Sequence, residues 1–322
     1  MTASAPVAPS GGSRAALVAA IAVTLVVWAS GFAGIRHAGR AFPPASLALV
    51  RFSIASVVLA AVWWWRRRGE RAAGAPAAPA PTRGEWIRIA VAGFLTIVVY
   101  AIALNAGSRT VTAGVACLLV NTGPIFTAIG AMLFLGERLG WRGWAGMFCA
   151  FGGVLLVARG MGGEFHWGGD AGLVLLAALS QAVWFGVSKP LLARHGAFVT
   201  TCRTVWLGVL FLLPFSGEAW AALRAAPPAA IASIVYLGVF PGAIGYLTWT
   251  YILSRMPASR AASLLYLVPP IAFTIAWLAL GETPTLLAIL GGIPIVAGVA
   301  LVNTGRRSGA PRAVAPAGGD PT

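Results

Sequence analysis

Two stretches of this chain decide its fold, because one repeats the other: residues 113–137 read AGVACLLVNTGPIFTAIGAMLFLGE, and residues 258–282 read ASRAASLLYLVPPIAFTIAWLALGE. They align without a gap at an offset of 145 residues, and nine of the 25 aligned positions are identical. The identities include one proline and the Gly-Glu pair that closes each stretch. Alanine and leucine coincide easily in apolar segments, but a proline and a Gly-Glu pair at one offset indicate an internal duplication.

The composition outside the repeat is that of a membrane protein. The 322 residues are 59% hydrophobic and only 10% charged, whereas a soluble domain carries roughly 25% charged residues. A bilayer-spanning helix needs about 20 apolar residues, and runs of this kind fall at 15–35, 45–65, 86–106, 112–134, 143–159, 169–189, 198–215, 229–251, 260–280 and 285–303. The sequence therefore predicts an all-α polytopic membrane protein of about ten transmembrane helices, with nine or eleven still open.

The two copies are separated by an odd number of predicted spans, so the second must be upside down relative to the first. Inverted repeats are a recurring transporter architecture, because two similar halves of opposite orientation can exchange conformations. Duplication without transport is the alternative. The predicted organisation is a flexible N-terminal tail (1–14), a first five-helix repeat (15–159) with a mobile cytoplasmic linker (66–85), a second, inverted five-helix repeat (160–303) and a flexible C-terminal tail (304–322).

The distribution of lysine and arginine predicts the orientation. With the N-terminus inside, 16 of the 23 cationic side chains fall in cytoplasmic segments, five fall outside, and Arg51 and Arg203 lie within spans. Cytoplasmic loops carry the excess of positive charge, so we expect a multi-pass protein of the cell membrane with both termini in the cytoplasm. The net charge of +15 then reflects topology and gives no reason to expect a nucleic-acid partner.

The chain resembles the EamA-type transporters of the drug/metabolite transporter superfamily. The resemblance rests on WASGFAGIR (28–36), on residues 104–146, on ALSQAVWFGVSKPLLAR (178–194) and on residues 254–282, and it extends over nearly the whole chain. It implies ten spans in two inverted halves and the export of amino acids, other metabolites or drugs, while some relatives carry nucleotide sugars or phosphates. The second copy departs from the pattern by ending in Gly281-Glu282-Thr283-Pro284.

Polar and aromatic residues inside the spans are the candidates for a substrate cavity, because a buried amide or hydroxyl needs a protein or water partner. Helix packing is the alternative for any one of them. Together they predict a neutral, aromatic-lined, hydrogen-bonding cavity that suits a small neutral or zwitterionic metabolite such as an amino acid. The candidates are Trp28, Ser30, Tyr100, Asn105, Asn121, Thr122, Gln181, Trp184, Tyr246, Trp249 and Tyr266.

Two further sets of residues suggest moving parts. Arg51 with Glu282, and Arg203 with Glu137, are predicted as two gate pairs across the repeats, one on each side of the membrane. The alternative is that each arginine reaches toward lipid headgroups and each glutamate caps a turn. Pro124 and Pro269 are candidates for a hinge or cavity wall, or for a simple kink in a packed helix.

Other functions have less support. No HExxH, GxSxG or Walker A motif occurs, so an enzyme is not expected, nor is a cofactor or a metal. A lipid-carrier flippase stays open, because the lateral openings it would need are not visible in a sequence. Besides a small-molecule substrate and membrane lipid, a second copy of the chain is a possible partner. Glycines in the fifth and tenth spans, among them Gly146 and Gly291, would serve either an internal contact or a homodimer.

Overall fold

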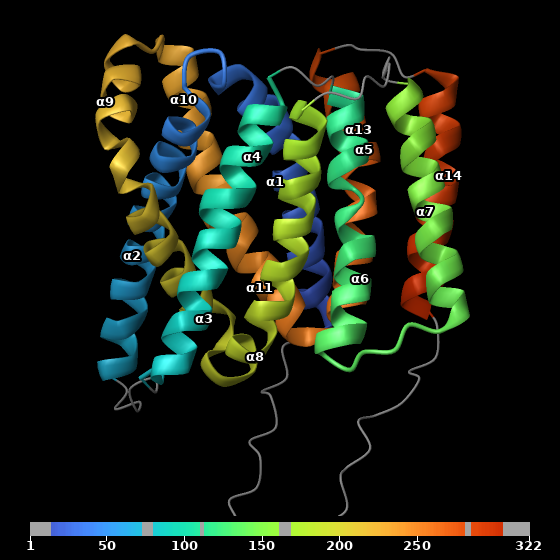
Figure 1. Ribbon diagram of the computed structural model, residues 1–322, viewed down its shortest axis with the longest axis horizontal. Coiled ribbons are helices and arrows are strands. Elements are labelled where there is room, and N and C mark those ends of the chain that lie inside the picture. Colours follow the sequence, from blue (N-terminus) through green and yellow to red (C-terminus); the bar gives the residue numbers. More distant parts are fainter. Residues whose placement is uncertain (1–13, 73–79, 110–112, 161–168, 281–284, 305–322) are drawn as a thin grey trace, which may run out of the picture.

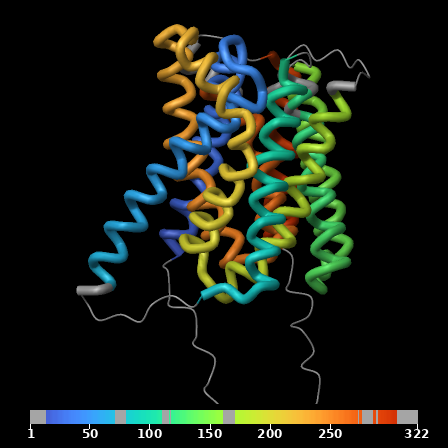
Figure 2. Tube along the Cα trace, turned by 60° about the vertical axis from the view of Figure 1, so that its left-hand side comes forward, coloured from blue at the N-terminus to red at the C-terminus, as the bar shows by residue number. Residues whose placement is uncertain are grey.

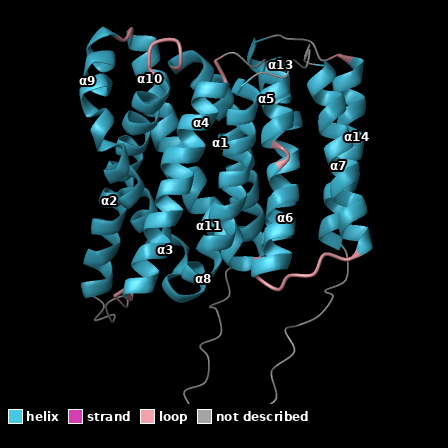
Figure 3. Cartoon of the chain, in the orientation of Figure 1, coloured by secondary structure: helices cyan, strands magenta, loops and turns pink. Residues whose placement is uncertain are grey.

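The computed structural model describes residues 14–72, 80–109, 113–160, 169–280 and 285–304. Over these residues every regular element is helical, and the helices stand side by side in one bundle (Figures 1 and 3). α1 begins and α14 ends at the same end of the bundle (Figure 1).

The described residues of the first half form seven α-helices and one π-helix. Their bounds are α1 (Arg14–Ala38), α2 (Pro44–Ala72), α3 (Arg83–Gly93), η1 (a π-helix, Phe94–Val99), α4 (Tyr100–Gly107), α5 (Ala113–Val120), α6 (Gly123–Phe134) and α7 (Trp141–Gly160).

The second half begins with a helix that reverses direction. α8 is 44 residues long, but Gly196 inside it has φ 73° and ψ 166°, and the chain turns back there at the lower end of the bundle (Figure 1). A positive φ is easily adopted only by glycine. The elements are α8 (Gly169–Leu212), η2 (Leu213–Phe215), α9 (Ser216–Ala225), α10 (Pro228–Leu237), η3 (a π-helix, Gly238–Ile244), α11 (Gly245–Arg255), α12 (Ala258–Ser263), η4 (a 3₁₀ helix, Leu264–Leu267), α13 (Val268–Leu280) and α14 (Leu286–Thr304).

The helices have the length and composition to cross a bilayer. Among the described residues six helical segments qualify by length and hydropathy, and the longest of them, Ala171–Ala225, contains the turn at Gly196. Leu118–Phe134 and Ile289–Thr304 are shorter apolar helices. Large apolar side chains such as Phe134, which is 83% exposed, point outward, as a surface facing lipid requires. The prediction of an all-helical, multi-pass membrane protein is therefore confirmed.

The duplication extends to irregular backbone that hydropathy does not reveal. α3 begins at Arg83 and α10 at Pro228, which is the offset of 145 residues seen in the sequence. Each helix then passes into a π-helix, η1 or η3, and continues as α4 or α11. π-helical turns are rare and occur often at functional sites. Their presence at equivalent places in both halves indicates that a functional site lies at this depth of the bundle.

The repeated stretches quoted above are also broken at equivalent places. A two-residue turn at Asn121 and Thr122 separates α5 from α6 (Figure 3), and the 3₁₀ helix η4 separates α12 from α13. Pro124 and Pro269 follow these breaks in the first turn of α6 and of α13. At the start of a helix the missing proline N–H leaves no partner unsatisfied. The prolines thus restart a helix, and their role as hinges stays a prediction.

Glycines hold the two halves together along α7 and α14. A Cβ on Gly146 would lie 2.7 Å from the Gly298 carbonyl oxygen, and a Cβ on Gly153 would lie 2.6 Å from that of Gly291. Gly146 and Gly153 are the repeat equivalents of Gly291 and Gly298, so the contact relates the halves by an approximate two-fold axis. These glycines serve an internal contact, which was one of the two predicted roles.

The predicted linker at 66–85 is too long. α2 continues through Arg66–Arg68 to Ala72, and α3 begins at Arg83. Stacking of arginines on aromatic rings stabilises this extension, with the Arg66 Cζ 4.5 Å from the Phe198 ring centroid and the Arg68 Cζ 3.7 Å from that of Trp64. Figure 2 shows the lower part of α2 leaning away from the bundle. Residues 73–79, like both predicted tails, lie outside the described residues, apart from Arg14 and Thr304.

Candidate functional site

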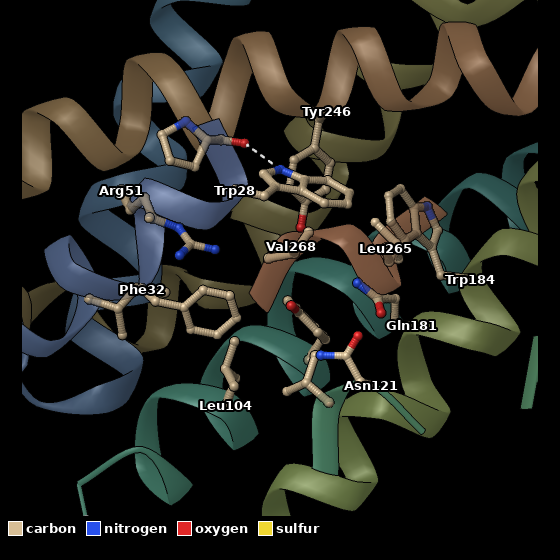
Figure 4. Close-up of a pocket in the computed structure, with 15 residues that line it drawn as sticks. Trp28, Phe32, Arg51, Leu104, Asn121, Gln181, Trp184, Tyr246, Leu265 and Val268 are labelled. Carbon is tan, nitrogen blue, oxygen red and sulfur yellow. Dashed lines mark hydrogen bonds between the residues drawn. The ribbon is translucent and has the colours of Figure 1, made fainter. Parts of the chain in front are cut away.

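A cavity of about 70 Å³ lies in the middle of the bundle. α1, α2, α4 and α8 contribute to its wall, and so do the π-helix η3 and the two broken repeat stretches (Figure 4). Its lining residues are Trp28, Gly31, Phe32, Ile35, Arg51, Tyr100, Leu104, Val120, Asn121, Gln181, Trp184, Pro241, Tyr246, Leu265 and Val268. The irregular backbone of both halves therefore converges on one cavity, as in transporters whose binding sites form at discontinuous helices.

Arg51 supplies the charge of this cavity. Of the 15 described residues that line it, Arg51 is the only ionised one, and its side chain points inward from α2 (Figure 4). The residue is 5% exposed, its Cζ lies 4.4 Å from the Phe52 ring centroid, and its Nε has no hydrogen-bond partner among the described residues. An arginine does not lose its proton in a protein. The cavity therefore holds a buried positive charge that no described carboxylate neutralises.

Two tyrosines face Arg51 from opposite halves. Tyr100 follows η1 directly, and it lines the cavity together with Gln181. Tyr246 lies two residues after Ile244, the last residue of η3, and its Oη lies 3.1 Å from Thr96 Oγ1. Each π-helix thus sets the position of one cavity tyrosine. The hydroxyls and the guanidinium together form a polar wall able to bind an anion.

Aromatic rings form another part of the wall. Trp28 packs edge-on against Tyr246 with ring centroids 6.1 Å apart, and Trp184 lies 5.2 Å from the same ring. Trp28 Nε1 donates to the Pro241 carbonyl oxygen inside η3, at 3.3 Å (Figure 4). Trp249 and Phe185, with ring centroids 4.7 Å apart, continue this packing beyond the lining residues. Aromatic faces attract a cation, so the cavity has chemistry for both charges of a zwitterion.

The eleven predicted cavity residues divide into two groups. Six line the cavity: Trp28, Tyr100, Asn121, Gln181, Trp184 and Tyr246. The other five do not line it, and four of them have identified packing roles. Ser30 Oγ lies 2.6 Å from Tyr236 Oη, Asn105 Nδ2 donates to the Pro44 carbonyl, Thr122 Oγ1 donates to the Leu119 carbonyl, Trp249 packs on Trp28 and Phe185, and Tyr266 is fully buried.

The prediction of a neutral cavity is wrong. Arg51 was assigned to a gate because of its place along its span, but it points to the centre of the bundle (Figure 4). A charge inside an apolar span was the available signal, since such residues are functional by default. Glu282, its predicted partner, lies outside the described residues.

The second predicted gate pair, Arg203 with Glu137, does not form. Glu137 follows α6 and accepts hydrogen bonds from the Ala258 N–H (2.7 Å), the Ser259 N–H (3.1 Å) and the Ser259 hydroxyl (2.8 Å). It therefore caps the first turn of α12, in the other half of the chain. Lys189 lies within electrostatic range of Glu137 and donates to the carbonyl oxygens of Leu253 and Met256. The turn between α11 and α12 is thus fixed at both ends.

Arg203 lies elsewhere. Its Nη1 is 3.4 Å from His195 Nδ1, and its Cζ is 5.8 Å from the Trp86 ring centroid. Glu85, at the start of α3, forms an ion pair with Arg194 at 3.2 Å, and its Oε1 lies 3.4 Å from His195 Nε2. The position of Arg203 in the α8 segment that packs on α3 explains why it does not reach Glu137. Both carboxylates, Glu85 and Glu137, nonetheless connect the first half to the second at the lower end of the bundle.

Across the described part of the chain no group of three or more histidine, cysteine or acidic side chains is arranged to hold a metal.

Comparison with known proteins gives consistent results. The model of the EamA-like transporter family matches residues 15–159 and again 171–304. A probable terminal-alkyne amino-acid exporter of Streptantibioticus cattleyicolor is 38% identical over 88% of this chain and 92% of its own length. An uncharacterized transporter of Bacillus subtilis, YdfC, is 37% identical over 85% of this chain and 86% of its own. One crystal structure has the same fold, with a TM-score of 0.68 and 19% identity over 90% of this chain and 96% of that one.

Proposed function

The chain belongs to the EamA-like transporter family, and from this premise we propose that it exports a small amino acid or a close analogue from the cytoplasm by alternating access. The family is one of transporters, so the protein is a membrane transporter with a small-molecule substrate and not an enzyme. The relative named as an exporter of terminal-alkyne amino acids supports the substrate class and the direction.

The observation that carries the proposal is the unneutralised guanidinium of Arg51 in the central cavity. An ionised side chain inside a membrane protein marks a substrate path unless another group pairs with it. A carboxylate is the natural partner, because the guanidinium presents parallel N–H groups that match its two oxygens. We assign the α-carboxylate of the substrate to Arg51 and to the hydroxyls of Tyr100 and Tyr246.

The ammonium group of the substrate belongs at the aromatic side. The rings of Trp28, Trp184 and Tyr246 offer cation–π contacts, and the side-chain carbonyls of Asn121 and Gln181 offer acceptors. Amines without a carboxylate meet the positive charge of Arg51 with no compensation. The site thus favours a zwitterion over a simple cation, and this distinction separates amino acids from most cationic drugs.

Cavity size points the same way. Pockets for drug-sized ligands have volumes of roughly 300–1,000 Å³, whereas this cavity measures about 70 Å³. The space suits a ligand of few atoms. Transport of larger drugs, phosphorylated metabolites or nucleotide sugars is the alternative that the family leaves open, and a single cation is a weak site for a group carrying two negative charges.

The proposal includes ten spans in two inverted halves with cytoplasmic termini. Support comes from the paired π-helices, the paired breaks and the glycine contact between α7 and α14, all of which follow the 145-residue repeat. The loop 135–140 and the turn at Gly196 lie at the lower end of the bundle, which is also the end where α1 begins and α14 ends (Figure 1). We assign this end to the cytoplasm, because most of the cationic side chains belong to its segments.

The test is counterflow in proteoliposomes loaded with unlabelled L-amino acids, with a terminal-alkyne amino acid such as propargylglycine among them. Arg51→Gln removes charge-assisted hydrogen bonds of about 1.5–3 kcal/mol each, so the half-saturation concentration should rise by roughly 30-fold or more. Arg51→Lys keeps the charge but loses the paired N–H geometry, so its half-saturation concentration should lie between those of wild type and Arg51→Gln. Arg138→Gln, at an exposed loop position, is the matched control.

A second arm uses analogues. The decarboxylated amine of a transported amino acid should not compete for wild-type uptake, whereas the parent amino acid should. Unchanged amino-acid transport by a folded Arg51→Gln protein, or equal competition by the amine, would remove the carboxylate site and with it the amino-acid assignment.

A further inference from the structure

A second depression, an apolar groove of about 550 Å³, lies on the outer surface between α6 and α8, the helices that stand side by side in Figure 1. We name it the α6–α8 groove. Its walls carry side chains directed away from the protein: Leu133 is 71% exposed, Leu179 48% and Val183 44%. In a membrane-spanning bundle such a surface faces lipid chains and not water.

The floor of the groove is made of small residues. Gly130 of α6 and Gly186 of α8 both line it, and a Cβ added at either would meet no heavy atom within 4 Å. These glycines therefore do not permit a close contact between helices, in contrast to Gly146 and Gly153 of α7. They leave a channel along the surface that the described side chains do not fill.

The groove is separate from the central cavity. None of the 16 described residues that line the groove is among the 15 that line the cavity. A lipid in the groove therefore contacts none of the residues that line the cavity, Arg51 included. This separation is the reverse of what a lipid flippase needs.

One end of the groove is positively charged. Among its described lining residues Arg88 is the only ionised one, and no carboxylate is present. α3 begins at Arg83, so Arg88 lies about 7.5 Å further along the helix axis, within the reach of an arginine that extends to the headgroup level. On the proposed orientation this level belongs to the cytoplasmic leaflet.

We propose that the α6–α8 groove is a binding site for an anionic phospholipid of the cytoplasmic leaflet, with an acyl chain between α6 and α8 and the phosphate on Arg88. The apolar walls exclude a polar occupant, and the single cation selects a negative headgroup over a zwitterionic one. The proposal rests on the proposed membrane orientation but not on the substrate. The bound chain also contacts Ala258, whose N–H donates to Glu137, so the lipid lies beside the contact between the two halves.

The experiment is native mass spectrometry of the delipidated full chain, titrated with phosphatidylglycerol or with phosphatidylcholine of identical chains. Wild type should retain phosphatidylglycerol preferentially. Arg88→Gln should weaken phosphatidylglycerol binding roughly fivefold and phosphatidylcholine binding by less, because the choline cation offsets the attraction between Arg88 and the phosphate. Gly130→Leu and Gly186→Leu, which fill the groove, should each weaken both lipids.

Gly152→Leu is the matched control, because Gly152 is exposed on α7 and also has no heavy atom within 4 Å of an added Cβ. It should bind lipid as wild type does, and intact monomer mass with an unchanged melting temperature shows that each variant is folded. Equal phosphatidylglycerol binding by wild type, Arg88→Gln and the groove-filling variants would overturn the proposal. So would a dimer that only the groove-filling variants abolish, since a second copy would then occupy the groove.

Discussion

Replacing Glu137 with glutamine should shift the protein toward the state that is open to the cytoplasm. The carboxylate accepts one hydrogen bond at Oε1, from Ala258, and two at Oε2, from Ser259. Glutamine offers one acceptor and one NH₂ group. Its better orientation keeps both bonds to Ser259 and turns the NH₂ toward the Ala258 N–H, where two donors then face each other.

The magnitude follows from this count. A hydrogen bond to a charged acceptor contributes about 1.5–3 kcal/mol and a neutral one about 0.5–1.5 kcal/mol. Losing one bond and weakening two costs roughly 3.5–6 kcal/mol, which we reduce by about half because Glu137 is only half-buried and water screens and replaces the lost contacts. The remaining cost of about 2 kcal/mol changes an equilibrium roughly 30-fold.

This cost falls on one state of the transporter. Glu137 belongs to the first half and α12 to the second, so on the proposed mechanism and orientation the contact breaks when the halves separate on the cytoplasmic side. A ligand or contact shifts a conformational equilibrium only through its preference for one state. Glu137→Gln therefore raises the population of the cytoplasm-open state without affecting the cavity residues.

The assay is the labelling of a single cysteine by a membrane-impermeant thiol reagent from the cytoplasmic side. Ser188→Cys, in a background lacking Cys117, Cys149 and Cys202, places the thiol at a position that is 1% exposed and adjacent to Lys189. Glu137→Gln should speed its labelling by an order of magnitude or more. Glu70→Gln, an exposed glutamate whose nearest cation, Arg67, is 4.0 Å away, should not. Unchanged labelling in a folded Glu137→Gln protein would refute the reasoning.

Two other substitutions test the packing. Gly153→Ala, whose Cβ would lie 2.6 Å from the Gly291 carbonyl oxygen, should destabilise the protein by about 1–3 kcal/mol. The neighbouring Gly152→Ala, whose Cβ has open space around it, should melt in detergent at or above the wild-type temperature. Equal melting temperatures for the two variants would show that α7 and α14 do not depend on this contact. Trp28→Phe removes the hydrogen bond to the Pro241 carbonyl, worth about 1 kcal/mol, and weakens the cation–π face. It should raise the half-saturation concentration for transport a few-fold, and an unaltered value would exclude Trp28 from the substrate contact.

The regular helices were predictable where composition alone determines them. The predicted spans 143–159 and 285–303 correspond to α7 (Trp141–Gly160) and α14 (Leu286–Thr304) within two residues, because polar or glycine-rich segments bound both runs. The predicted span 86–106 corresponds to α3, η1 and α4 together. Hydropathy measures which residues are apolar and is blind to the hydrogen-bond register, so the π-helices were not predictable from it.

The candidate site was predictable in its residue types and not in its charge. Polar residues in the spans pointed to the cavity, but a linear sequence does not show which face of a helix meets the centre of the bundle. For α2 the inward face is visible in the structure, where Leu47, Ala48, Arg51, Phe52 and Ala55 are all buried and recur at helical spacing. Applied to Arg51, that periodicity places its side chain on the inward face instead of at the membrane boundary.

The symmetry of the fold and the asymmetry of its charge together determine how a substrate lies. The π-helices and the broken spans occur in both halves of the chain, and the cavity is lined from both halves. Arg51 has no counterpart in the cavity, because Gly196 stands 145 residues later in the sequence and Arg203 packs near His195 and Trp86. On the proposed function, a zwitterion therefore binds with its carboxylate toward α2. In the proposed alternating-access cycle, Arg51 and Trp28 move with the first half and Trp184 and Tyr246 with the second, so the substrate bridges the two halves with its carboxylate held by Arg51.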